Sequence, residues 1–405
     1  MRRLLFLSSE YPPGPGGIGT HAHQVTLGLA REGWDPIVLT PQDYADDAEV
    51  RSFNASQPFE IVRLRRFPGP PFEAIYRTVI LARWAARHRP HVLVASGSRS
   101  ILLAAARWRH RAIPWVAIGH GTEFGPGGRL TRPLIRRAFG RATSVVCVSE
   151  FTRRRMREAG IHPRSEAVIP NGADSSLFRR LSFEDSLAMR RELGVGEEAR
   201  LLITVGNVTE RKGQDLVVRA LPAILRAQPR TRYVVVGLPT RGDALLDLGR
   251  RLGVADRIHL LGRVDANRLT RLLNAADVFV MTSRTTASGD VEGYGIAVVE
   301  AALCGLPAVV AGGSGLAEAV DAGNTAVVVP PDDPDAIARA ALTLLGDESA
   351  RRVMGERARR RAEQEQTWSR CAARYAEMLE KVCRDWSAGP PRSLPETPGA
   401  IRTLS

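Results

Sequence analysis

The sequence predicts an α/β protein with two doubly wound domains that face a cleft, and three observations support this. The chain of 405 residues is long enough for two domains of ordinary size. In both halves, short continuous apolar runs such as Leu4–Ser8 and Leu201–Gly206 alternate with amphipathic stretches, as in parallel sheets covered on both faces. A polar stretch at Arg179–Glu192 separates the two alternations and reads as a linker.

The first half alternates strands with helices, and we assign it to a domain at residues 1–185. Its strands are continuous apolar runs too short for helices, whereas its helices show apolar residues three or four positions apart. The expected strands are Leu4–Ser8, Asp35–Thr40, Ile61–Leu64, Val92–Ala95, Trp115–Gly119, Ser144–Val148 and Ala167–Pro170, and the helices are His21–Glu32, Phe72–His88 and Glu150–Ala159.

The second half repeats the pattern, and we assign it to a domain at residues 190–366. The expected strands are Leu201–Gly206, Tyr233–Val236, Ile258–Leu261, Val278–Met281, Ala308–Ala311 and Ala326–Val329. The expected helices are Gly213–Ala227, Leu245–Leu252, Ala266–Ala275, Ile296–Cys304, Asp335–Leu345, Ser349–Gln366 and Trp368–Trp386. Residues 387–405 are rich in Pro, Ser and Thr, which predicts a disordered tail.

Composition points to a cytoplasmic protein. The sequence contains no run of about 18 apolar residues, the length of a membrane-spanning helix. The apolar core after Met1 is too short for a secretion signal, and the N-terminus reads as a first strand. Cys147, Cys304, Cys371 and Cys383 lack CxxC spacing, so we expect buried free thiols and no metal site.

The positive charge is concentrated in the first half. The formal net charge is +14; the 27 basic and 16 acidic residues through residue 189 give +11, and the remaining 30 and 27 give +3. A local positive field favours anionic partners. Only Lys212 and Lys381 are lysines, so the arginine excess could also reflect a GC-rich genome.

Two carboxylates frame the most informative segment, Glu292-Gly-Tyr-Gly-Ile-Ala-Val-Val-Glu300. Gly293 and Gly295 precede an apolar helix, and their small size leaves the first backbone N–H groups of that helix uncovered. Such amides, together with the helix dipole, form a phosphate site, here at Gly295 and Ile296. Glu300 needs a polar partner inside this helix, and a ribose diol would serve.

The Glu-x7-Glu pattern resembles the donor-sugar motif of the retaining nucleotide-sugar glycosyltransferases of family 4, which have the GT-B fold. The string from Ser283 to Gly295 is most similar to the branch of phosphatidylinositol mannosyltransferases. Other matching segments are Gly14–His21, His120–Glu123, Val148–Glu150, Ile169–Asp174, Val205–Gly213 and Gly312–Glu318.

The resemblance implies a reaction and a final helix. It implies transfer of a hexose from a UDP- or GDP-sugar with retention of α configuration, without a cofactor or a divalent metal. It also implies that the last helix, at residues 367–386, returns to brace the first domain.

The candidate site residues follow from position and from the resemblance. Arg211 and Lys212, after the first strand of the second domain, suit a diphosphate, because Arg offers a fork of donors and Lys a point charge. His120 follows a buried strand and, by resemblance, contacts the donor hexose together with Glu292. The remaining donor-binding candidates are Gly16, Gly17, Asn207, Gly262, Val264, Gly293, Tyr294, Gly295, Ile296 and Glu300. Asn207 stands where the family usually carries an arginine.

Three alternative functions remain. Gly14–Gly19 matches the GxGxxG pattern of dinucleotide-binding dehydrogenases, although the spacer after Ser9 and the missing acid at Thr40 count against it. A nucleotide-sugar epimerase on the same fold is a second alternative. A non-catalytic protein that binds sugar or nucleic acid is a third.

The acceptor is predicted from the charge of the first domain, which in GT-B enzymes supplies most of the acceptor site. Basic clusters stand at Arg63 to Arg66, Arg129 to Arg141 and Arg153 to Arg157, and Phe67, Phe72 and Trp84 could add an apolar edge. We expect an anionic acceptor, such as a phospholipid headgroup or a phosphorylated small molecule, with peripheral contact at the inner face of the membrane and no nucleic acid partner. A soluble secondary metabolite is the alternative acceptor, and the oligomeric state stays open.

Overall fold

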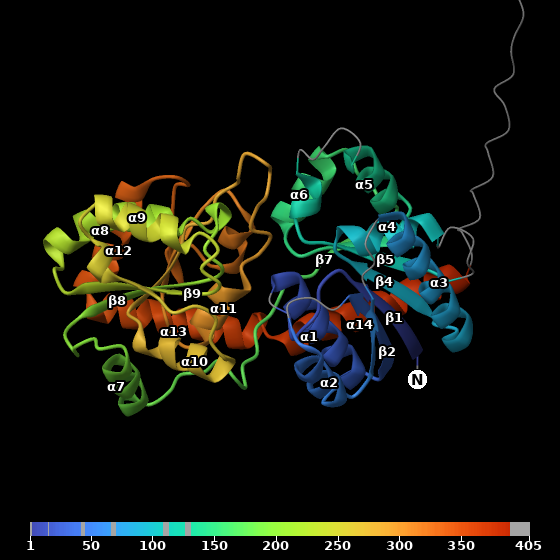
Figure 1. The fold of residues 1–405 in the computed structure, drawn as a ribbon, viewed down its shortest axis with the longest axis horizontal. Helices are drawn as coiled ribbons and strands as arrows, with labels where there is room; N and C mark the ends of the chain where they lie inside the picture. The colour runs from blue at the N-terminus through green and yellow to red at the C-terminus, as the bar shows by residue number, and fades with distance from the viewer. Residues whose placement is uncertain are drawn as a thin grey trace, which may run out of the picture.

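The computed structural model describes residues 2–14, 16–41, 45–65, 70–107, 113–125 and 131–388. The expected tail therefore lies outside the described residues from residue 389 on. Two parallel sheets form the centres of two domains that lie side by side along the long axis of the molecule (Figure 1). The predicted fold class is confirmed.

The N-terminal domain is built on a seven-stranded sheet with the order β3-β2-β1-β4-β5-β6-β7. Its strands are β1 (Arg2–Ser8), β2 (Trp34–Pro41), β3 (Glu60–Leu64), β4 (Val92–Ser96), β5 (Trp115–Gly119), β6 (Ser144–Cys147) and β7 (Glu166–Val168). Its helices are α1 (Gly17–Arg31), α2 (Asp47–Ala55), α3 (Pro70–His88), α4 (Ser98–Arg107), α5 (Thr131–Gly140) and α6 (Glu150–Glu158), with the short 3₁₀ helix η1 (Thr122–Phe124).

The C-terminal domain is built on a six-stranded sheet with the order β10-β9-β8-β11-β12-β13. Its strands are β8 (Arg200–Val205), β9 (Thr231–Val236), β10 (Ile258–Leu260), β11 (Val278–Met281), β12 (Ala308–Ala311) and β13 (Ala326–Val329). Its helices are α7 (Phe183–Glu192), α8 (Gln214–Ala227), α9 (Gly242–Arg251), α10 (Ala266–Ala275), α11 (Ile296–Leu303), α12 (Pro334–Gly346) and α13 (Glu348–Glu365), with the 3₁₀ helices η2 (Glu210–Lys212), η3 (Ala255–Arg257) and η4 (Gly315–Ala319).

Both sheets follow the same doubly wound order, and the position of the ligand site follows from it. The chain reverses direction across the sheet between β1 and β4 in one domain and between β8 and β11 in the other. The central strands are fully buried, as Leu4 to Leu7 and Val278 to Met281 show, which explains their continuous apolar runs. The ligands of such sheets bind where the strands at the reversal end.

The interpretation of Arg179–Glu192 as a linker is wrong for its second part, which forms helix α7. Ser182 caps this helix by accepting a hydrogen bond from the backbone N–H of Asp185 at 3.1 Å, and Glu184 adds negative charge to its first turn. Met189 alone is buried on the helix, against the C-terminal domain. With a single buried residue, the helix shows no clear apolar face in its sequence. Helices α2, α4 and α5 were likewise not predicted.

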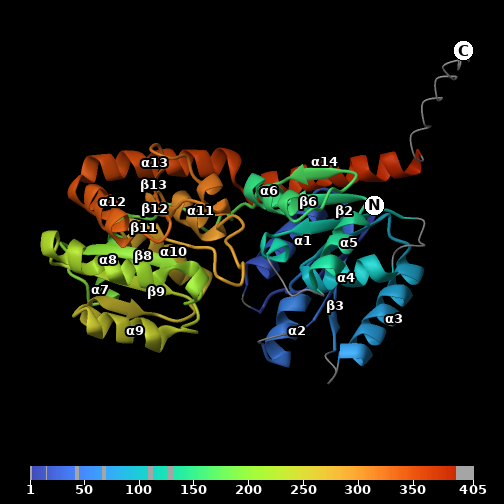
Figure 2. The ribbon, with the colours of Figure 1, turned by 90° about the horizontal axis from the view of Figure 1, so that it is seen from above.

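The last helix, α14 (Trp368–Ser387), leaves α13 and runs along the N-terminal domain (Figure 2). It packs on α1 so closely that a Cβ atom on Gly28 would overlap the side chain of Ala372. The buried hydroxyl of Tyr375 lies 3.2 Å from Nε2 of His21. Cys147, Cys304 and Cys371 are buried free thiols, as expected, whereas Cys383 is only partly buried.

Candidate active site

The candidate residues of the C-terminal domain gather where β8 and β11 end. The segment after β8 carries Arg211 and Lys212 on η2, and the segment after β11 carries Glu292 and leads into α11. Glu292 accepts a hydrogen bond from Nη1 of Arg211, and its Oε2 lies 2.7 Å from Nζ of Lys212. The structure therefore brings together the two predicted cations and the first predicted carboxylate.

Glycines place the two cations. A Cβ atom on Gly206 would lie 3.0 Å from Cε of Lys212, so the bare backbone of Gly206 makes room for the lysine stem. Gly213 has a positive φ of 70° and packs against the carbonyl of Thr282. This left-handed residue ends η2, and α8 starts directly after it. The backbone N–H of Arg284 donates to the carbonyl of Arg211 at 2.8 Å and ties the two segments together.

Burial and charge act in opposite directions on this cluster. The side chains of Lys212 and Glu292 are only 14% and 12% exposed. Burial lowers the pKa of Lys212, and Glu292 offsets part of that effect. Burial alone would raise the pKa of Glu292, but Lys212 and Arg211 outweigh it and hold that pKa below its usual range. Glu292 is therefore charged near neutral pH.

Helix α11 begins with bare amides beside this cluster. Gly295, at φ 91°, precedes the helix, its first turn carries no acid, and among the described residues no side chain caps it. The first N–H groups of α11 are thus open to an anion. Burial raises the pKa of Glu300, further along α11, to about 7, although the nearby charge of Lys212 acts to lower it.

His120 comes from the N-terminal domain, at the end of β5. Its Nε2 lies 2.9 Å from the hydroxyl of Ser96, and its ring meets that of His21 edge-on with centroids 5.0 Å apart. Burial lowers the pKa of His120 to about 4, so the imidazole is neutral at pH 7. Glu123 accepts hydrogen bonds from the backbone N–H groups of His120 and Gly121, at 3.0 and 2.9 Å, and fixes the turn.

The two domains touch at the predicted sugar-binding loop. A Cβ atom on Gly293 would overlap the carbonyl oxygen of His120, so only glycine permits this approach. His120 and Glu292 therefore come from opposite domains to one place. This arrangement could hold a sugar between them.

The remaining candidates lie on loops at the same edge. The side-chain oxygen of Asn207 accepts from the N–H of Leu238 at 3.0 Å, so it braces the loop after β9. Gly262 accepts from the N–H of Gly237 at 2.9 Å, and Val264 follows in the same loop. Gly16 and Gly17 start α1, and among the described residues no side chain caps that helix.

Sequence reasoning missed several residues around the site. Asp290 forms a second ion pair with Arg211, 3.2 Å from its Nε, and Ser96 binds His120. Ser149 and Glu318 were noted only as parts of motifs, yet both bridge the domains. Asp290 lies two residues before Glu292, and this spacing is the one signal that could have identified it.

Several arginines of the clusters expected to attract the acceptor make contacts within the protein. Arg63 donates to the side chain of Asn54 and, at 2.6 Å, to the carbonyl of Pro12, so it holds the segment after β1. In the Arg153–Arg157 cluster, three arginines form ion pairs: Arg153 with Glu150, Arg154 with Glu318 and Arg157 with Glu166. The fourth, Arg155, donates to the carbonyl of Gly289. These arginines therefore take part in contacts within the protein, whereas Arg65 of the first cluster is exposed.

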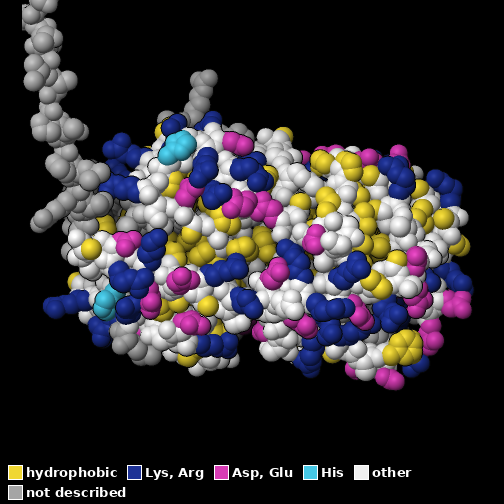
Figure 3. Space-filling view, turned by 180° about the vertical axis from the view of Figure 1, so that it is seen from behind, with side chains coloured by type: hydrophobic (Ala, Val, Ile, Leu, Met, Phe, Trp, Pro, Cys, Tyr) yellow, Lys and Arg dark blue, Asp and Glu magenta, His cyan; other side chains and the backbone are white. Residues whose placement is uncertain are grey.

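The other cluster and the aromatic edge have mixed outcomes. Arg66, Phe67 and Arg129 lie outside the described residues, whereas Arg132, Arg136 and Arg137 of α5 are exposed. Trp84 is partly buried: it packs against the core and stacks on His88 with ring centroids 4.8 Å apart. On the face shown in Figure 3, basic and acidic side chains are interspersed over both domains.

Two features of the described residues bear on the predicted chemistry. Among the described residues, no group of three or more His, Cys, Asp or Glu side chains is arranged to hold a metal ion. Within the same part of the chain, no helix is both long and apolar enough to cross a bilayer.

Comparison with known proteins defines the class. The fold is GT-B: Alr3699/HepE of Anabaena, solved with UDP-glucose, superposes with a TM-score of 0.80 at 22% identity, over 94% of this chain and 100% of that one. Sucrose-phosphate synthase of Thermosynechococcus elongatus also gives 0.80, at 18% identity, over 94% and 99% of the two chains. Likeness at this identity establishes the fold alone.

The sequence establishes the family. The profile described as Glycosyltransferase Family 4 matches residues 15–177, and that of Glycosyl transferases group 1 matches residues 185–361. A GDP-mannose-dependent alpha-(1-6)-phosphatidylinositol monomannoside mannosyltransferase of Mycobacterium tuberculosis is 30% identical, over 94% of this chain and 98% of its own. Glycogen synthase of the same organism is 28% identical, over 93% and 94%.

The chain belongs to glycosyltransferase family 4 and transfers a sugar from a nucleotide-sugar donor. A related mannosyltransferase of Corynebacterium glutamicum, GDP-mannose-dependent and acting on monoacylated phosphatidylinositol monomannoside, is 29% identical over 95% of this chain and 99% of its own. Membership in this family removes the dehydrogenase, epimerase and nucleic-acid-binding alternatives.

Proposed function

We propose that this protein moves a hexose from a GDP- or UDP-sugar to a hydroxyl of an anionic lipid, with retention of α configuration. One observation carries the donor half of this proposal. Lys212, Arg211 and the open start of α11 converge on Glu292, and His120 faces them from the other domain. Cations and bare amides suit a diphosphate, and a carboxylate opposite an imidazole suits sugar hydroxyls.

Each residue has a role in this proposal. Lys212 and Arg211 neutralise the diphosphate without a divalent ion, and the amides of Gly295 and Ile296 seat its terminal phosphate. Gly16 and Gly17 bring further amides from the opposite domain. Glu300 holds the ribose, and the backbone around Gly262 and Val264 lies where the base would be read.

Glu292 changes partners in the reaction. Without donor it pairs with Lys212 and Arg211, in the position where a phosphate would neutralise the same cations. Donor binding would free its carboxylate to accept a hydrogen bond from a sugar hydroxyl. The departing diphosphate would then help to deprotonate the acceptor on the same face of the sugar. Stabilising the charge that develops on this leaving group is the largest catalytic contribution we expect.

An exposed apolar stripe on α3 supports the lipid acceptor. Phe72, Ile75 and Val79 are 69%, 57% and 57% exposed, and their spacing puts them on one side of the helix. Arg83, one turn further on, is exposed too. An apolar face bounded by cations is the pattern of a helix that lies in a membrane interface. The mannosyltransferase relatives act on phosphatidylinositol mannosides, which agrees with this acceptor class.

Turnover with defined donors and vesicles tests the reaction. GDP-mannose and UDP-glucose are each supplied with phosphatidylinositol vesicles, with neutral phosphatidylcholine vesicles as the control. We expect an α-linked glycolipid from one donor and only with the anionic lipid. Transfer to a soluble acceptor alone would replace the lipid proposal, and no turnover with either donor would refute it.

Vesicle binding tests the surface independently of turnover. Sedimentation with anionic vesicles should be strong at low salt and weaker at high salt, because salt screens the attraction to arginines. Replacing Phe72, Ile75 and Val79 together by serine should abolish it, whereas replacing the exposed Phe183 of the other domain should not. Equal sedimentation of all three proteins would contradict a membrane role for α3.

A further inference from the structure

Helix α6 of the N-terminal domain and its N-cap residue form hydrogen bonds with the loop that carries Glu292. The hydroxyl of Ser149 donates to the carbonyl of Gly293 at 2.7 Å. Arg155 donates to the carbonyl of Gly289, at the other end of this loop, at 3.3 Å. We call residues 289–293 the donor loop. Its backbone is thus held by the opposite domain on both sides of Glu292.

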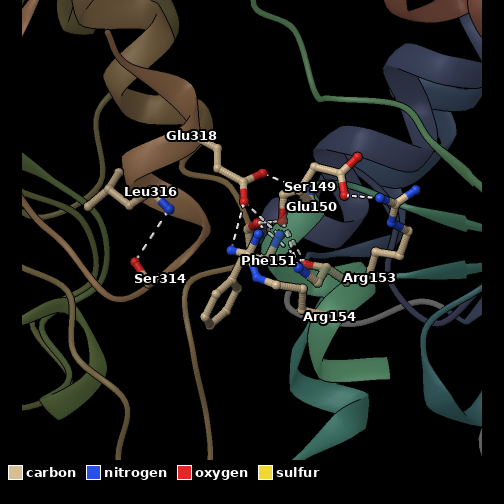
Figure 4. Close-up of polar contacts among 10 residues, drawn as sticks. Ser149, Glu150, Phe151, Arg153, Arg154, Ser314, Leu316 and Glu318 are labelled. Carbon is tan, nitrogen blue, oxygen red and sulfur yellow. Dashed lines mark hydrogen bonds and ion pairs between the residues drawn. The ribbon is translucent and has the colours of Figure 1, made fainter. Parts of the chain in front are cut away.

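A carboxylate of the C-terminal domain caps the N-terminus of α6. Glu318 accepts hydrogen bonds from the backbone N–H groups of Glu150 at 2.7 Å and Phe151 at 2.6 Å (Figure 4). Ser149 satisfies the next N–H, that of Thr152, at 3.0 Å. Hydrogen bonds from a helix N-terminus to a carboxylate are charge-assisted and therefore strong. Arg154 lies 3.3 Å from Glu318 but is 62% exposed, and exposed ion pairs contribute little.

The 3₁₀ helix η4 connects Glu318 to the donor loop. The N–H of Gly315, at the start of η4, donates to the carbonyl of Glu292 at 3.0 Å. Leu316 is fully buried and packs over Gly295, directly before α11. A displacement of Glu318 would therefore move the backbone on which Glu292 and the start of α11 depend.

The chain crosses between the domains twice, near Ala173 and at Gln366 to Trp368, and the second crossing contacts η4. The N–H of Ala173 donates to the carbonyl of Gln366 at 2.9 Å, and the N–H of Trp368 donates to the carbonyl of Ala173 at 3.2 Å. Two crossings joined by main-chain bonds form a natural hinge. The side chain of Gln366 also donates to the carbonyl of Ala319, at 2.8 Å, so η4 contacts both the hinge and α6.

We propose that Glu318 and Ser149 are positioning residues that lock the domains closed and thereby set the donor loop. This inference rests on the proposed donor site. When the domains part, water replaces the partner on both sides: it binds the carboxylate of Glu318 and the first N–H groups of α6. The lock is therefore reversible. The donor loop then loses its bonds from Ser149 and Arg155. Nucleotide-sugar affinity thus depends on a contact that the ligand itself does not touch.

Two measurements on Glu318→Ala and Ser149→Ala test the lock. Small-angle X-ray scattering without ligand should show a larger radius of gyration than for the wild type. The KM for the donor should rise roughly tenfold, as for a protein whose binding-competent state falls to about a tenth of the population, with a much smaller change in kcat. Glu318→Gln keeps one acceptor oxygen and should fall between wild type and Glu318→Ala.

Glu150→Gln is the matched control, because within the described part of the chain its carboxylate pairs with Arg153 of the same helix, at 2.6 Å. It should leave the radius of gyration and the KM unchanged. Unchanged values in Glu318→Ala would overturn the inference. Should Glu318→Ala fail to fold, Glu318→Gln and Ser149→Ala decide the question by the same readouts. A wild type without turnover refutes the donor site, whereas the scattering comparison still tests the lock.

Discussion

Two helices at the domain interface, α11 and α6, begin in opposite ways. Helix α11 starts after Gly295, and among the described residues no side chain caps it. Helix α6 starts at Ser149, and its first N–H groups are all taken, two of them by Glu318 of the other domain. Both ends attract anions for the same physical reason. The difference indicates that one end is kept open for a ligand and the other is used to join the domains.

The other helices extend this comparison. Helices α1 and α8 start at glycine beside the site, and within the described chain neither has a side-chain cap. Side chains cap most of the helices that start elsewhere, namely α2 by Asp46, α7 by Ser182, α10 by Asp265, α12 by Asp333, α13 by Asp347 and α14 by Thr367. Among the described helix starts, those of α1, α8 and α11 thus lie without a side-chain cap where the donor diphosphate is proposed to bind, and that of α9, at Arg241, is uncapped as well.

The largest effect is expected from the charges beside the open start of α11. Lys212→Ala and Glu292→Ala should each lower kcat/KM by roughly two to three decades, or about 3 kcal/mol of barrier, because both contacts strengthen as the diphosphate leaves. Steady-state kinetics with whichever of GDP-mannose and UDP-glucose supports turnover measure this, and circular dichroism checks folding. Near-normal rates in both variants would contradict the role of this end of α11.

A smaller, pH-dependent effect is expected from Glu300. Its pKa of about 7 means that it is protonated below neutrality and charged above it. A ribose diol donates to the carboxylate, so donor affinity should be full above pH 7 and fall as the pH drops through 7, by roughly tenfold per unit well below the pKa. Calorimetric titrations across this range measure the effect.

Glu300→Gln is the reference, because the phosphates of the nucleotide titrate equally in both proteins. The variant should lack the part of the pH dependence that Glu300 causes. Parallel curves for the two proteins would remove Glu300 from the ribose site.

The smallest effect is expected at a capped helix far from the site. Asp347 accepts from the N–H of Ala350 at 2.8 Å and caps α13. Asp347→Ala should lower the free energy of unfolding by about 1 kcal/mol and leave donor affinity unchanged. Urea denaturation and nucleotide titration measure the two quantities. A loss of donor affinity would show that capped and open starts do not differ as claimed.

The sequence predicted the strands, and the proximity of Lys212 and Glu292, for a physical reason. Buried parallel strands are continuous apolar runs, and the Lys212–Glu292 pair comes from two motifs that end neighbouring strands. The contact of Glu318 with α6 joins residues 168 apart through main-chain N–H groups, which leave no trace in a sequence. The structural role of Arg63 also escaped prediction, because its partner is a backbone carbonyl in a distant loop.

The most direct test of the donor site is a calorimetric titration of GDP and UDP into three proteins. We expect the wild type to bind one of them, and Lys212→Ala to bind it at least tenfold more weakly, which corresponds to about 1.4 kcal/mol. Glu292→Ala should bind it no more weakly than the wild type, because the carboxylate competes with the diphosphate for the same cations. Failure of the wild type to bind either nucleotide, or equal weakening in both variants, would contradict the account.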